Sequence, residues 1–127
     1  GDADKADLVL FGCPHCTIQE MKTLASLLEG KRIIDGKRLW VGLPYQHYTL
    51  AQRMKYTGAV ERAGGVISSS CMATIPDSPI PEGVNVIATN SFKAAHYISR
   101  LTKGRVRVVI EDMEKCIQAI TKGQRKG

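Results

Sequence analysis

The chain has 127 residues, of which 43% are hydrophobic and 24% charged, a composition typical of one globular domain and not of a disordered segment. No apolar run approaches the roughly 20 residues of a membrane span, and the first residues are too polar for a signal peptide. The net charge of +6 would suit nucleic acid, but the basic residues are scattered without interleaved aromatics. We therefore expect a cytoplasmic protein with neither a nucleic-acid partner nor a membrane contact.

Short apolar runs alternate with amphipathic segments along the chain. In chain order these patterns predict a strand at 8–11, a helix at 17–29, a strand at 39–43, a helix at 50–63 that breaks at Gly58, a strand from 66 toward 71, a proline-rich loop at 74–83, a strand at 84–88, a helix at 91–101, a strand at 106–110 and a helix at 113–120. Because apolar strands alternate with helices, the fold class is α/β. We predict a three-layer α/β/α domain with a mainly parallel sheet of about five strands.

The ends of several predicted elements carry clear capping and stop signals. Thr17 and Glu20 have the spacing of a capping box, Gly30 ends the first helix, and Ser91 is expected to cap the helix that follows it. We expect a single domain over residues 1–121, trimmed as tightly as a fragment of a larger subunit would be. Residues 122–127 are expected to form a basic flexible tail.

The chemically distinctive residues follow the ends of three predicted strands. They lie in the segments Cys13–Cys16, Ser70–Cys71 and Asn90–Lys93. Ligands of open parallel sheets bind outside the carboxyl ends of the strands, so we expect the three segments to meet at one edge.

The pair Cys13 and Cys16 permits three interpretations. A thiolate between a strand and a helix has its pKa lowered by the helix N-terminus. The motif Cys13-Pro14-His15-Cys16 matches the active site of thioredoxin-like thiol–disulfide oxidoreductases, whereas Cys71 could join the pair as a third thiolate around a metal or cluster. The third possibility is a pair of small residues in a tight turn. Cys116 differs, because it lies on the apolar face of the last predicted helix and is expected to fill the core.

Asn90, Ser91 and Lys93 stand at the predicted N-terminus of a helix, where free amides, a hydroxyl and an ammonium group suit an anion. The simpler interpretation is that Ser91 caps the helix and Lys93 lies in solvent. Ser70 could also offer its hydroxyl to a substrate.

Three of these motifs together resemble the aconitase X family. Gly12–His15 before a helix, Ser70–Met72 after a strand and Ala88–Tyr97 occur in the same order in that family. The similarity runs from about Asp7 to Ala119 and corresponds to the C-terminal part of the family's large subunit.

The resemblance implies a hydro-lyase with an aconitase-like architecture, similar to phosphomevalonate dehydratase and the cis-3-hydroxyproline dehydratases. It implies an iron–sulfur cluster, [4Fe–4S] in preference to [2Fe–2S], with Cys13 and Cys71 as ligands and Cys16 as the third. Ser70 and the segment Asn90–Lys93 are then expected to face a small hydroxy acid such as phosphomevalonate. The implied partners are the remainder of the large subunit and a small swivelling subunit that supplies the catalytic base, so the chain alone is expected to be inactive.

Overall fold

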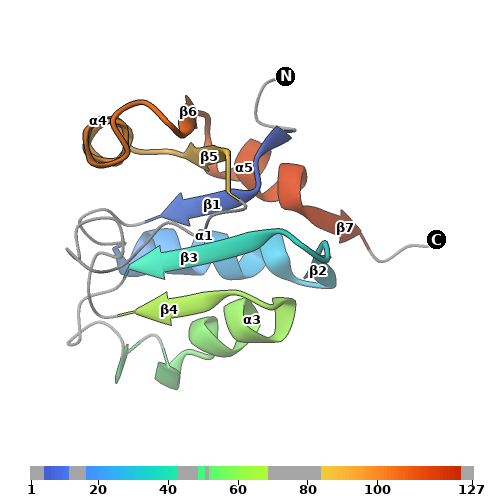
Figure 1. Ribbon diagram of the computed structural model, residues 1–127. Coiled ribbons are helices and arrows are strands. Elements are labelled where there is room, and N and C mark those ends of the chain that lie inside the picture. Colours follow the sequence, from blue (N-terminus) through green and yellow to red (C-terminus); the bar gives the residue numbers. More distant parts are fainter. Residues whose placement is uncertain (1–4, 12–16, 43–48, 51, 69–83, 124–127) are drawn as a thin grey trace.

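The computed structural model describes residues 5–11, 17–42, 49–50, 52–68 and 84–123 (Figure 1). Five parallel strands form one sheet, whose spatial order is β4 (Val66–Ser68), β3 (Arg38–Gly42), β1 (Leu8–Phe11), β5 (Val86–Thr89) and β6 (Arg107–Ile110). The helices are α1 (Ile18–Leu28), α3 (Tyr56–Ala63), α4 (Phe92–Leu101) and α5 (Met113–Ile120). The five-stranded parallel sheet confirms the α/β fold class.

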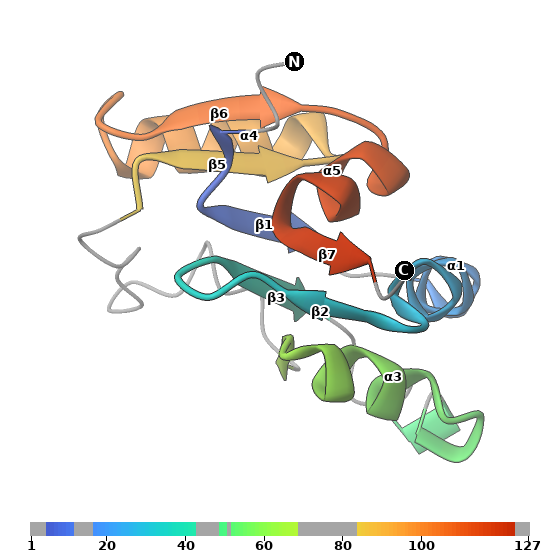
Figure 2. The same cartoon turned by 90° about the vertical axis from the view of Figure 1, so that its right-hand side faces the viewer.

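Alternate residues of the central strand β1 pack on opposite faces of the sheet, as a fully buried strand requires. Val9 and Phe11 belong to a cluster with residues of α1, α3 and α5, whereas Leu8 and Leu10 belong to a second cluster with residues of α4. The helices therefore form a layer on each side of the sheet, with α4 beside β5 and β6 (Figures 1 and 2). The predicted three-layer arrangement is confirmed.

The helix starts predicted from capping chemistry are also confirmed. The Thr17 backbone amide donates to the Glu20 carboxylate at 2.8 Å, and the Glu20 amide donates to the Thr17 hydroxyl at 3.0 Å. The Ser91 hydroxyl accepts from the amide of Ala94 at 3.1 Å. Because these bonds satisfy amides that the helix itself leaves unpaired, they fix where α1 and α4 begin.

The predicted break at Gly58 is wrong, because α3 runs through this residue without interruption. The helical backbone is interrupted earlier, at Lys55, whose φ of 68° lies in the left-handed region. A glycine inside a helix costs only about 1 kcal/mol. Burial of Thr57 and Val60 on the inner side of α3 outweighs that cost. The predicted end of the helix is confirmed, since Gly64 has a φ of +106°.

A small antiparallel pair of strands, β2 (Lys31–Ile33) and β7 (Thr121–Gly123), was missed from the sequence. Lys122 lies opposite Arg32 in this pair, so regular structure continues to Gly123. Strands of three residues carry too little hydrophobic alternation to be recognised, and this pair forms because the chain after α5 returns to the end of α1. Residues 124–127 lie outside the described part.

Asp7 fixes the position of β1 between its two neighbours. Its side-chain oxygen Oδ2 accepts from the amides of Asn85 at 2.9 Å and Val86 at 3.1 Å, and its backbone carbonyl accepts from the amide of Arg38 at 3.0 Å. These bonds join the starts of β1, β3 and β5. The three strands then run in register toward the opposite edge of the sheet, which is where the candidate site lies.

Candidate functional site

The direction in which successive strands are added to the sheet reverses between β1 and β5. After β1 the chain passes through α1 to β3 on one side, whereas after β5 it passes through α4, on the other face, to β6 on the opposite side. Leu10 pairs with Thr89, so the two strands end side by side. Such a switch in an open parallel sheet opens a crevice outside the carboxyl ends of the strands, and this crevice is the usual ligand site.

Of the residues around the crevice that this rule predicts, the structure describes the turn from β5 into α4. Thr89 is fully buried, its hydroxyl accepts from the amide of Ser91 at 3.3 Å, and its carbonyl accepts from the amide of Glu111 at 3.0 Å. Asn90 and Ser91 are half-buried, whereas Lys93 is exposed in the first turn of α4. The structure thus confirms Ser91 as the helix cap, while substrate contacts of Asn90, Ser91 and Lys93 remain predictions.

Thr89 is a structural residue of the site that the sequence reasoning missed. Its hydroxyl holds the Ser91 amide in place at the start of α4. The available signal was a threonine at the end of an otherwise apolar strand, Val86–Thr89. A polar side chain in such a position needs a hydrogen-bond partner, and the nearest candidates are the amides of the following turn.

The cysteines Cys13, Cys16 and Cys71, together with Ser70, lie outside the described residues. The elements next to them are described: the segment of Cys13 and Cys16 joins β1 to α1, and the segment of Ser70 and Cys71 follows β4. Both strands end at the same edge of the sheet as β5. Because β3 separates β4 from β1, the ends of β1 and β4 lie two strand spacings apart, about 10 Å.

The donor chemistry of these segments fits an iron–sulfur cluster, whose irons prefer thiolate ligands. Three of the four cysteines of the chain belong to segments that leave the same sheet edge. The part of the chain that the structure describes has no other group of three histidine, cysteine or carboxylate residues that could hold a metal ion. Cys13, Cys16 and Cys71 remain the metal ligands that the sequence predicts.

Cys116 does not belong to this site. Its side chain is fully buried in α5, and its sulfur lies 3.7 Å from the carbonyl oxygen of Glu111. Burial, followed by the nearby carboxylates of Glu111 and Asp112, raises the pKa of the Cys116 thiol to about 12. A neutral thiol in a packed core is a structural residue, as the sequence predicted.

We expect native Cys116 to resist alkylation at about pH 8, because a thiol with a pKa near 12 has about a thousandfold less thiolate than one at 9.0. Iodoacetamide labelling with peptide mapping, in buffer and in urea, measures this rate for Cys116 separately from the other cysteines. The unfolded chain releases the proton first as pH rises. The contribution of this thiol to stability is therefore complete below about pH 9 and falls toward pH 12. Equal labelling rates in buffer and in urea would contradict the buried position.

The protein-family model that describes the third domain of aconitase X matches residues 6–122 of this chain. The chain belongs to the aconitase X family. It is 36% identical over 116 residues to the phosphomevalonate dehydratase large subunit of Methanocaldococcus jannaschii, covering 91% of this chain and 27% of that protein. It is 34% identical over 123 residues to the cis-3-hydroxy-L-proline dehydratase of Hypocrea jecorina, covering 96% of this chain and 20% of that protein. The chain thus spans about a quarter of the length of these relatives.

The fold agrees with this assignment. A crystal structure of the holo-form of aconitase X from Thermococcus kodakaraensis superposes with a TM-score of 0.75 and 34% sequence identity. The match covers 94% of this chain and 30% of that one. A thioredoxin-like fold needs an antiparallel hairpin after its active-site helix, whereas β5 and β6 here are parallel. The family and the topology therefore disfavour the thiol–disulfide oxidoreductase.

The sequence also predicted that no segment crosses a membrane. Among the described residues, no helix combines the length and the apolar character that a membrane span requires.

Proposed function

We propose that this chain is the cluster-carrying third domain of the large subunit of a dehydratase that removes water from a small hydroxy acid. The relatives are dehydratases and the chain corresponds to about a quarter of them, so the catalytic unit requires further parts. The observation that supports the proposal most directly is the switch in strand order between β1 and β5, whose carboxyl ends lie side by side. In the sequence, β1 leads toward Cys13 and Cys16, and β5 leads into α4.

In this proposal Cys13 and Cys71 are cluster ligands and Cys16 is the third, around a [4Fe–4S] cluster in preference to a [2Fe–2S] cluster. When bound, such a cluster supplies a Lewis-acidic iron for the hydroxyl group that leaves. The N-terminus of α1 stabilises a nearby thiolate, because its unpaired amides and its dipole favour negative charge. The capping box of Thr17 and Glu20 holds that helix start in place.

The substrate's anionic groups are proposed to lie against the start of α4. The first turn of α4 brings backbone amides to this point beside the side chains of Asn90 and Ser91, and the exposed ammonium group of Lys93 adds positive charge. Ser70 is proposed to contribute a hydroxyl from the neighbouring segment. A phosphate or a carboxylate satisfies these donors equally well. Phosphomevalonate is the first candidate, because four of the first five relatives by similarity are phosphomevalonate dehydratase large subunits.

The remainder of the large subunit and a small subunit are the proposed partners. We assign the catalytic base to those partners, as the resemblance to the aconitase X family implies. The isolated chain is accordingly proposed to lack dehydratase activity.

Anaerobic reconstitution with iron and sulfide tests the cluster site. We expect wild type to gain a visible absorption band and bound iron, and Cys13→Ala or Cys71→Ala to lose most of both, because a cluster needs its thiolates. Cys16→Ala is expected to behave in the same way as the third ligand. Cys116→Ala is the control, because Cys116 is buried away from the crevice, and it should keep the band if the variant folds.

Electron paramagnetic resonance of the reduced protein distinguishes the two cluster types. A band that survives all three ligand substitutions would contradict the assigned ligands. A reversible disulfide between Cys13 and Cys16 in wild type, without any cluster band, would favour the oxidoreductase instead.

A further inference from the structure

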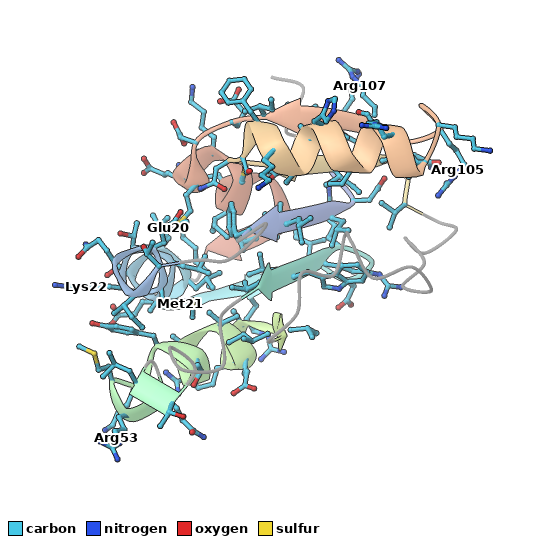
Figure 3. The ribbon with its side chains drawn as sticks, turned by 90° about the vertical axis from the view of Figure 1, so that its left-hand side faces the viewer. Glu20, Met21, Lys22, Arg53, Arg105 and Arg107 are labelled. Atoms are coloured by element: carbon cyan, nitrogen blue, oxygen red, sulfur yellow. The ribbon has the colours of Figure 1, made fainter. Side chains whose placement is uncertain are left out.

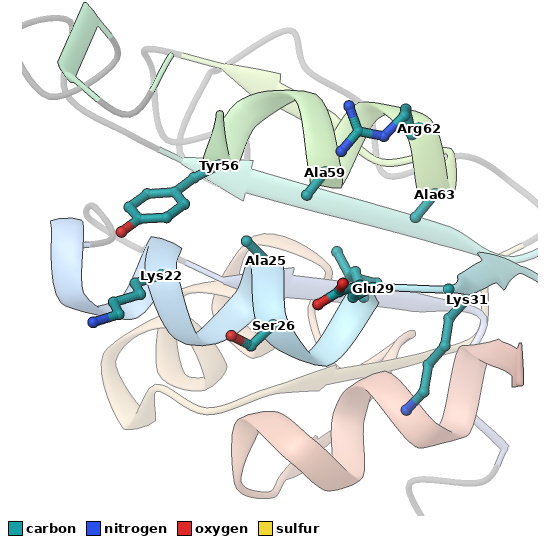
Figure 4. A pocket seen from close by; sticks show the side chains of 11 residues that line it. Lys22, Ala25, Ser26, Glu29, Lys31, Tyr56, Ala59, Arg62 and Ala63 are labelled. Atoms are coloured by element: carbon teal, nitrogen blue, oxygen red, sulfur yellow. The ribbon is translucent and has the colours of Figure 1, made fainter. Parts of the chain in front are cut away.

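The outer surface of the molecule has a groove between α1 and α3, on the face of the sheet opposite α4 and apart from the crevice. It encloses about 520 Å³ (Figure 4). Its floor consists of small side chains: Ala25 of α1 faces Ala59 of α3, and Ala63 lies one turn further along. Outer helix faces of globular proteins usually carry long solvated side chains. Small residues on two neighbouring helices leave room for a third helix to approach closely.

The rim of the groove carries an excess of positive charge. It is formed by Lys22, Lys31 and Arg62, opposed by the single carboxylate of Glu29. None of the three cations forms an ion pair with another residue of the described part of the chain. A surface with three cations and one anion attracts a partner with the opposite pattern.

The aromatic ring of Tyr56 closes one end of the groove (Figure 4). It is half-buried, so part of its ring is available for contact. Tyrosine offers a large rigid apolar surface together with a polar hydroxyl, which makes it frequent among the dominant residues of protein interfaces.

From these three observations we infer that the α1–α3 groove is a docking site for an acidic amphipathic helix of a partner protein segment. The helix lays a stripe of small or apolar side chains on Ala25, Ala59 and Ala63. Its flanking carboxylates reach Lys22, Lys31 and Arg62. This inference is independent of the cluster and of the dehydratase reaction, because the groove shares no residue with the crevice between β1 and β5.

A synthetic helix provides the test. The probe is a capped alanine-rich peptide of about 18 residues, long enough to be helical in isolation, with glutamates on both sides of an Ala/Leu stripe. Titration into the isotope-labelled 127-residue chain is followed by amide chemical shifts. We expect shifts concentrated in residues 22–31 and 56–63. A control peptide that differs only by a proline at its centre should bind at least about tenfold more weakly, because proline breaks the helix.

Charge-reversal variants separate the groove from general attraction to a basic protein. The double variant Lys22→Glu/Arg62→Glu should weaken binding at least about tenfold, which is about 1.4 kcal/mol. Lys103→Glu/Arg105→Glu is the matched control: both residues are exposed, the change in charge is the same, and Arg105 lies far from Lys22 (Figure 3). The control should change the affinity less than about twofold. All four positions lie at the surface, so both variants are expected to fold.

Three results would overturn the inference. One is equal weakening by the control variant, which would indicate general charge attraction. Another is displacement of the peptide by inorganic phosphate at similar concentration, which would indicate a small anion site. The last is a set of chemical-shift changes outside the two helices.

Discussion

Phe11→Ala is expected to lower the free energy of unfolding by about 3–5 kcal/mol, the cost of removing a large aromatic side chain from a packed core. Phe11 is fully buried in the cluster that also contains Met21, Leu24 and Ile117. It is the last residue of β1 and packs between the sheet and the helices that cover it. Truncation leaves a cavity there. The free energy of unfolding of a domain is about 5–15 kcal/mol, so this loss would be a large part of the total stability.

Urea unfolding followed by circular dichroism measures this loss. The chain has only two phenylalanines, and the other one supplies the control: Phe92 is 78% exposed at the start of α4. Phe92→Ala should therefore change the free energy of unfolding by less than about 0.5 kcal/mol. Similar losses for the two variants would contradict the described position of β1 in the core.

Gly65→Ala is expected to destabilise the fold by about 1–3 kcal/mol through overpacking. Gly65 joins α3 to β4, and a Cβ atom there would lie 2.7 Å from Cγ1 of Val60 and 3.2 Å from Cδ2 of Leu39. It would also lie 3.2 Å from the carbonyl oxygen of Val60. The side chains of Val60 and Leu39 are buried, and the Val60 carbonyl belongs to the backbone of α3. Neither residue can therefore move away without loss of packing.

Gly58→Ala is the matched control, and its effect should have the opposite sign. The nearest atom to a Cβ at this position is Nη1 of Arg62 at 3.1 Å, the end of a flexible and exposed side chain. Alanine is favoured over glycine inside a helix by about 1 kcal/mol, so the variant should be as stable as wild type or more stable. Thermal unfolding of the two variants and of wild type measures these changes in stability. A destabilised Gly58→Ala variant, or an unaffected Gly65→Ala variant, would contradict the described packing of α3.

The candidate site could be predicted from the sequence in part. Cys13, Cys71 and Asn90 each follow an apolar run, and the general rule for parallel sheets places such residues at one edge. The rule does not say which strands are neighbours. Strand order depends on which helices cover which face, and only the tertiary structure places β1 beside β5 and separates it from β4 by β3. That order puts the end of β1, which leads toward Cys13, beside the end of β5, which leads to Asn90, and it puts the end of β4 further away.

The sequence by itself determined those features that depend on neighbouring residues. Apolar runs made the strands of the main sheet, the Thr17–Glu20 capping box started α1, and Gly64 ended α3. The family motifs around Cys13, Cys71 and Asn90 also needed no coordinates. These features can be predicted from the sequence because caps, turns and hydrophobic periodicity act over a few residues along the chain.

Only the tertiary structure decided the features that depend on distant contacts. The pairing of β2 with β7, the unbroken path of α3 through Gly58 and the groove between α1 and α3 all belong to this group. Each reflects packing free energy that outweighs a weak local preference. A three-residue strand or a single helical glycine differs from its alternatives by only about 1 kcal/mol, and burial against the rest of the molecule supplies more than that.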